Sequence, residues 1–131
     1  MSDTIKRQVL GHIASARAHD VTGRATVRIG KMTVHTRFCS QDARGSAKYK
    51  FNISPTTLAA DYELWICGSA ERYYLIPHAT VESIYHTPGA YVDRRHPQLR
   101  VISVDVDSHV ATYAQGGESL SLRTYSNRSL P

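Results

Sequence analysis

The sequence predicts a mixed α/β protein, more specifically of the α+β class, in which one amphipathic helix precedes a strand-rich region. Three observations predict this class. A helical apolar period covers residues 3–18, apolar runs typical of strands fill most of the remaining chain, and the composition, 41% hydrophobic and 21% charged, is ordinary for a globular protein. Because 131 residues are within the usual size of one domain, we expect residues 1–131 to form a single domain around a central mixed β-sheet.

The N-terminal helix is predicted by a single apolar stripe. Ile5, Val9 and Ile13 recur at helical spacing, and the period breaks before Gly23, where a chain reversal costs little. We expect the helix to pack on one face of the sheet through these three residues.

Two alternating runs, 24–29 and 32–38, predict a β-hairpin. The two residues between them begin with Gly30 and form a tight turn, which determines the register of the pair. That register places Arg24 opposite Arg37, where the two like charges repel each other. An anion bound between them would relieve this repulsion.

Six more strands are predicted after the hairpin. Two of them, 62–67 and 73–77, are continuously apolar, which is typical of central strands covered on both faces. A long loop is expected over 86–97 and a frayed tail over 126–131. The six predicted strands are 48–53, 62–67, 73–77, 100–106, 109–114 and 120–125. The residues expected at the centre of the core are Leu64, Trp65, Ile66, Leu75 and Ile76.

The charge of the chain favours an anionic partner. Sixteen Lys and Arg against eleven Asp and Glu leave a net charge of +5, with a pI of about 9.4. Alternation places basic side chains on one face of the hairpin, and such a face suits nucleic-acid phosphates, although an ordinary solvated sheet face is the alternative. The candidate binding residues are Arg24, Arg28, His35, Arg37, Arg44, Lys48 and Lys50, with Arg94 and Arg95 of the long loop as a second contact.

Four short segments of the chain, taken in order, resemble motifs of the PD-(D/E)XK superfamily, which has the restriction-endonuclease-like fold. They stand at 33–38, 49–53, 61–66 and 73–77, and the similarity covers about residues 5–78. The resemblance implies a fold that binds duplexes, so double-stranded DNA is the expected ligand.

The chain departs from this family at the positions that bind metal. His35 stands where the family has an acidic residue or Gln, Arg37 stands where it has Lys, and the strand 24–29 lacks the expected Asp. Magnesium requires oxygen ligands and is repelled by cationic side chains. The resemblance therefore implies a non-catalytic DNA-binding member with no cofactor, and we expect no divalent ion near His35 and Arg37.

Two other functions stay open. One is a metal-dependent endonuclease in which Asp20 or Asp42 joins Asp61 in an unorthodox magnesium site, although turn formation or capping is the more ordinary role of Asp20 and Asp42. The other is a protein-interaction or inhibitor module whose basic face meets an acidic protein. Aromatic residues such as Tyr91 suit stacking on unpaired bases, but also ordinary packing within a sheet. The sequence is also compatible with a homodimer.

Cysteine usage and hydropathy favour a cytoplasmic protein. Cys39 and Cys67 lack the spacing of a zinc site, and we expect two reduced thiols rather than a disulfide. No apolar run is long enough to span a bilayer, and the N-terminus lacks the apolar core of a signal peptide. We therefore expect no membrane partner.

Overall fold

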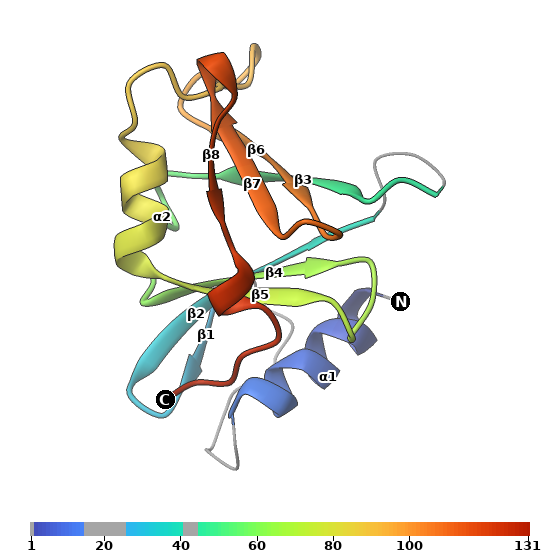
Figure 1. Cartoon of the computed structure of the whole chain (residues 1–131). Helices are drawn as coiled ribbons and strands as arrows, with labels where there is room; N and C mark the ends of the chain where they lie inside the picture. The colour runs from blue at the N-terminus through green and yellow to red at the C-terminus, as the bar shows by residue number, and fades with distance from the viewer. Residues whose placement is uncertain (1, 15–25, 41–44) are drawn as a thin grey trace.

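The computed structural model describes residues 2–14, 26–40 and 45–131, which form an α+β structure, as predicted. Eight strands of the described residues are arranged in two four-stranded sheets. Figure 1 shows helix α1 (Ser2–Ala14) below the first sheet, the second sheet above it, and helix α2 (His78–Tyr85) at the left. The first sheet is therefore the middle layer of the molecule.

The first sheet contains the predicted hairpin and both strands predicted to be central, in the order β1-β2-β4-β5. Of these two, β4 is central, whereas β5 is buried but lies at the edge of the sheet, which corrects the prediction for 73–77. Strands β2 and β4 are parallel while the other neighbours are antiparallel, so this sheet is mixed, as predicted. Gly30 has a φ of 61° in the turn, and the register places Thr26 opposite His35, as expected. The predicted pairing of Arg24 with Arg37 lies outside the described residues. The strands are β1 (Thr26–Ile29), β2 (Met32–Cys39), β4 (Tyr62–Cys67) and β5 (Tyr73–Pro77).

The remaining strands form a second, antiparallel sheet in the order β3-β6-β7-β8, where the sequence suggested a single sheet. Strand β3 pairs with β6, which lies far along the chain, and the alternation of a strand does not specify such a distant partner. The last strand ends earlier than predicted, and a 3₁₀ turn comes after it at Arg123–Tyr125. The strands are β3 (Lys48–Ile53), β6 (Arg100–Asp105), β7 (Val110–Ala114) and β8 (Glu118–Ser121).

Helix α2 is missing from the sequence-based prediction. It continues directly from β5 and buries only Val81 and Ile84, which are too few positions to reveal a helical period. The long loop predicted over 86–97 is irregular and bridges to the second sheet at Ala90 and Val92. In the described part of the chain, no helix is long and apolar enough to cross a membrane.

Two apolar clusters lie on opposite faces of the first sheet. One lies between this sheet and α1, which contributes Val9 and Ile13 as predicted, while Ile5 is only partly buried. The other lies between the two sheets, where Phe51 and Trp65 stack with ring centroids 5.2 Å apart. All five predicted core residues have an exposed fraction of 3% or less: Leu64, Trp65, Ile66, Leu75 and Ile76.

The C-terminal residues pack against α1 and β5, whereas the sequence suggested a frayed tail. Leu130 is buried, and its N–H donates to the Ile13 carbonyl at 3.0 Å. The Asn127 N–H donates to the Tyr73 carbonyl at 2.9 Å. The bond from Leu130 gives one of the last carbonyls of α1 a partner that the helix itself does not supply, and the bond from Asn127 joins the segment to β5.

Candidate nucleic-acid interface

The predicted basic face of the hairpin is divided between the interior and the surface. Arg28 is exposed on β1, and the Arg37 side chain is 28% exposed. His35 has only 3% of its surface exposed, because it lies under the second sheet, so the expectation that it belongs to an exposed binding face is corrected. Arg24 and Arg44 lie outside the described residues.

His35 belongs to a buried polar cluster around Glu63, its register partner on β4. His35 Nδ1 lies 2.8 Å from Glu63 Oε2, and Trp65 Nε1 donates to Glu63 Oε1 at 3.0 Å. Arg37 Nε lies 3.8 Å from the same Oε1. Both oxygens of this buried carboxyl group have partners, which is the usual condition for burying such a group. The burial of the Glu63 carboxyl group is therefore explained by partners within the chain.

Glu63 is a carboxylate beside His35 and Arg37 that the sequence pattern did not reveal. The expectation of no divalent ion there depended on the lack of a carboxylate in the paired strand 24–29, whereas Glu63, on β4, contacts both residues. Within the residues that the structure describes, no group of three His, Cys, Asp or Glu side chains is placed to hold a metal ion.

Asp61, a member of the alternative catalytic set, joins the beginnings of β2 and β4. Its Oδ2 accepts hydrogen bonds from the Thr33 N–H at 2.9 Å and the Thr33 hydroxyl at 3.3 Å, and its own N–H donates to Thr33 Oγ1 at 3.1 Å. These bonds position the hairpin beside the central strand. Asp20 and Asp42, the other two members, lie outside the described residues.

The lysines of β3 are exposed on the second sheet rather than beside the hairpin arginines. Burial alternates along β3, so Lys48 and Lys50 point away from the first sheet. Lys50 pairs with Ser103, which pairs with Thr112, and Thr112 pairs with Ser119. Because paired residues share a face, hydroxyl groups continue the row that Lys50 begins across all four strands.

Tyr91 extends the same face at one end of the sheet. Its N–H donates to the Tyr113 carbonyl and its carbonyl accepts from the Val101 N–H, both at 2.9 Å. Its neighbours Ala90 and Val92 form bridges with Ala114 and Arg100, which lie on the inward side of the second sheet. Because successive residues of an extended segment face opposite sides, the Tyr91 side chain points outward. We call this surface the outward sheet face, and it comprises Lys48, Lys50, Asn52, Tyr91, Val101, Ser103, Asp105, Val110, Thr112, Ser119 and Ser121.

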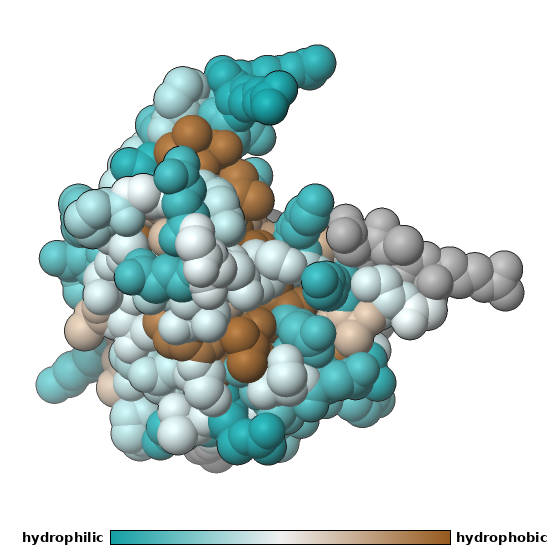
Figure 2. Space-filling view, turned by 45° about the horizontal axis from the view of Figure 1, so that its top comes forward, coloured by the Kyte–Doolittle hydropathy of each residue, from teal (hydrophilic) through white to brown (hydrophobic). Residues whose placement is uncertain are grey.

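Tyr91 and Val92 are notable for their exposure. Among the described residues they are the large hydrophobic side chains that are exposed, at 38% and 48%. Figure 2 shows that hydrophilic side chains predominate on the face in view, with the hydrophobic ones in separate small patches. An exposed aromatic ring is a feature of sites that stack on the bases of single-stranded nucleic acids.

The loop after Tyr91 presents Arg94 and Arg95, which are both exposed. The carboxylate of Asp93 accepts the backbone N–H of Arg95 at 2.8 Å and that of His96 at 3.0 Å. These bonds order the backbone of the loop that carries the two arginines.

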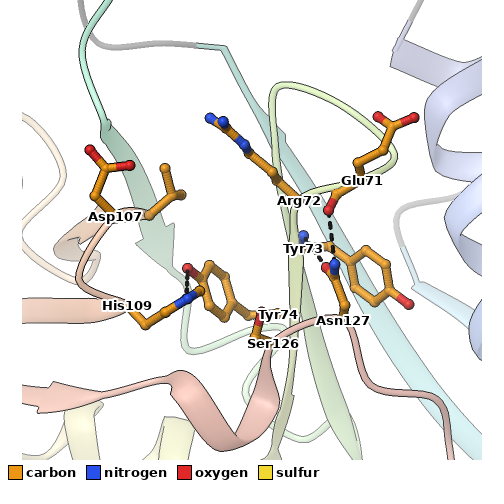
Figure 3. A pocket seen from close by; sticks show the side chains of 9 residues that line it. Glu71, Arg72, Tyr73, Tyr74, Asp107, His109, Ser126 and Asn127 are labelled. Carbon is orange, nitrogen blue, oxygen red and sulfur yellow. Dashed lines mark hydrogen bonds between the residues drawn. The ribbon is translucent and has the colours of Figure 1, made fainter.

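A small pocket of about 150 Å³ lies between the β4–β5 turn, the β6–β7 turn and the C-terminal segment. Figure 3 shows Tyr74 and His109 pointing toward each other there, while Tyr73 points to the other side of β5. The Tyr74 hydroxyl lies 2.8 Å from His109 Nδ1. Burial raises the pKa of Tyr74 well above its ordinary value, so the phenol stays protonated. The pair joins β5 to the β6–β7 turn.

Comparison with family models, with curated proteins and with solved structures found no match. The fold places Arg28 and Arg37 on the first sheet, Lys48 and Lys50 on the outward sheet face of the second sheet, and Arg94 and Arg95 in the exposed loop that follows Tyr91.

Proposed function

We propose that the protein binds nucleic acid through the outward sheet face. Lys48, Lys50, Arg94 and Arg95 would contact backbone phosphates, and Tyr91 would stack on a base. The observation that carries this proposal is the exposure of Tyr91 on the same sheet face as Lys50, next to a loop with two exposed arginines. A cationic surface that also offers an aromatic ring is the usual combination in proteins that bind single strands.

We propose a single strand as the preferred ligand, in place of the duplex that the resemblance implied. Bases inside a duplex are stacked on each other and cannot stack on Tyr91, whereas unpaired bases can. The hydroxyl row of Ser103, Thr112 and Ser119 supplies donors for phosphate and sugar oxygens beside the lysines.

We also propose that the protein is not a nuclease. His35, at one of the positions where the family binds metal, lies against Glu63, and Asp61 of the alternative magnesium set is hydrogen-bonded to Thr33. Incubation with plasmid in magnesium or manganese should leave the plasmid intact. Metal-dependent nicking that disappears in Asp42→Ala or Asp61→Asn would instead establish the endonuclease alternative.

The binding experiment compares a labelled single strand of about 12 nucleotides, a length within the site size of such proteins, with the matching duplex. Affinity is measured by fluorescence anisotropy at several salt concentrations. Lys50→Gln should lower the magnitude of the log-log salt slope by about 0.7, because one phosphate contact is lost. Tyr91→Ala should weaken single-strand binding by about 1–3 kcal/mol, while Tyr91→Phe keeps the ring and the affinity.

Lys31→Gln is the matched control, because Lys31 is an exposed lysine in the turn of the hairpin, on the other sheet. It should change neither the affinity nor the slope. Equal losses for Lys31→Gln and Lys50→Gln would mean that only net charge matters. Binding that is absent or insensitive to salt would overturn the proposal, and a partner protein that survives nuclease treatment would then support the protein-interaction module.

A further inference from the structure

The two cysteines lie directly opposite each other on neighbouring strands. Cys39 ends β2 and Cys67 ends β4, and the two residues are register partners in this parallel pair. Both side chains belong to the apolar cluster between the sheets, so they point to the same side of the first sheet. The sequence, in which they are 28 positions apart (67 minus 39), contains no sign of this proximity.

The backbone geometry is compatible with a bond between the two sulfurs. Neighbouring strands lie about 4.8 Å apart, and disulfides join Cα atoms separated by roughly 4.4–6.8 Å. Disulfides prefer Cβ atoms somewhat closer than the strand spacing, so bond formation would draw the two strand ends together. A disulfide that distorts its surroundings in this way is easily reduced, which is typical of reversible rather than permanent bridges.

Both thiols are accessible to a small reagent, to different degrees. Cys39 is partly exposed at the end of its strand. Cys67 is 1% exposed but lines an open pocket of about 340 Å³, together with Ser40, Gly68 and Arg72. Cys39 is therefore the more exposed of the two thiols, and we expect it to react first with an oxidant.

We propose that Cys39 and Cys67 form a dithiol site that oxidised glutathione converts reversibly into an intramolecular disulfide. The Cys39 thiolate attacks glutathione disulfide, which forms a mixed disulfide and releases one glutathione thiolate. The Cys67 sulfur, having lost its proton to solvent, then attacks the Cys39 sulfur and releases the second glutathione thiolate. Two protein thiols are oxidised, one glutathione disulfide is reduced, and two molecules of reduced glutathione leave with the two protons.

The environment of Cys67 predicts which step is slow. Burial, and next the neighbouring Cys39, raise the pKa of Cys67 to about 12, while Arg72 opposes the shift. Its thiolate is therefore scarce at neutral pH. Formation of the intramolecular disulfide should accelerate about tenfold for each unit by which the pH rises, as long as the pH stays below that pKa.

The experiment equilibrates the folded protein with mixtures of oxidised and reduced glutathione, blocks the remaining thiols with N-ethylmaleimide, and measures intact mass. The expected product has lost two hydrogens and takes up no maleimide, and excess reduced glutathione regenerates two reactive thiols. Peptide mapping should find Cys39 joined to Cys67 within one chain.

Cys67→Ala is the matched variant, and it should stop at a single glutathione adduct on Cys39. If this variant does not fold, mapping of the native protein at short reaction times should still show the Cys39 adduct before the bridge. Two stable glutathione adducts, a disulfide between two chains, or thiols that stay free in excess oxidant would each overturn the proposal.

Discussion

At the scale of single residues, Glu63 organises the space between the two sheets. It lies 2% exposed among apolar side chains, and its two oxygens meet His35 on one side and Trp65 on the other. A buried polar group is stable only while its partners remain, so each member of this cluster depends on the others. His35 and Glu63 can be buried between the two sheets because each supplies a polar partner to the other.

Glu63→Ala should lower the free energy of unfolding by about 3–5 kcal/mol, because buried groups of His35 and Trp65 lose their partner. Chemical denaturation followed by the fluorescence of Trp65, the single tryptophan, measures the effect. Glu82→Ala removes an exposed carboxylate that pairs with His78 on α2, and it should cost less than about 1 kcal/mol. Similar losses in the two variants would contradict the structural role of Glu63.

Cys67 should make the free energy of unfolding depend on pH in the alkaline range. Its pKa is raised from 9.0 to about 12 by burial, so above pH 9 the unfolded chain loses this proton while the folded chain keeps it. The free energy of unfolding should then fall as pH rises from 9 to 12, by up to about 1.4 kcal/mol per unit from this thiol alone. Tyr74, whose pKa burial also raises, adds to the same slope.

The measurement is urea denaturation at a series of pH values, under reducing conditions, for the native chain and for Cys67→Ala. The variant should be less stable at neutral pH but show a shallower decline above pH 9. Parallel curves would mean that the thiol ionises in the folded state as readily as in the unfolded one.

At the scale of elements, α1 is held by the first sheet on one side and by the C-terminal segment at its end. Its apolar stripe packs through Val9, Leu10 and Ile13, and Leu130 belongs to the same cluster. A helix of 13 residues is marginal by itself, so these contacts supply most of its stability. The last residues of the chain are thus part of the core.

Leu130→Ala should lower the free energy of unfolding by about 2–5 kcal/mol, as expected for a buried leucine. Arg128→Ala, at an exposed position two residues before it, should have little effect on stability. Circular dichroism during thermal unfolding measures both variants. A native-like melting temperature for Leu130→Ala would mean that the segment is frayed in solution, as the sequence suggested.

At the scale of the whole molecule, strands β4 and β5 connect the two apolar clusters. Leu64 and Ile66 enter the cluster under α1, whereas Trp65 and Cys67 enter the cluster between the sheets. Because these strands contribute side chains to both clusters, unfolding of either cluster should disrupt the other. The whole chain should therefore unfold in one step.

This cooperativity is tested by comparing probes that report on different layers. Trp65 fluorescence reports on the space between the sheets, and far-ultraviolet circular dichroism reports on all secondary structure. The two denaturation curves should coincide, with one midpoint. Separate midpoints would mean that the second sheet unfolds independently of the first.

The local features of the protein could be predicted from its amino-acid sequence. The apolar stripe of α1 follows from residue periodicity, the hairpin with its turn at Gly30 follows from alternation and turn chemistry, and the buried strands β4 and β5 follow from their continuous apolar runs. These features depend on residues close together in the chain, which is why spacing alone predicts them.

The distribution of the strands between two sheets, and with it the candidate site, became visible only in the folded chain. Pairing of β3 with β6 carried Lys48 and Lys50 away from the hairpin arginines, and the parallel pairing of β2 with β4 buried His35 against Glu63. The same pairing brought Cys39 beside Cys67. Alternation specifies which residues of a strand share a face, but the partner strand is chosen by packing between distant segments, and no local pattern encodes that choice.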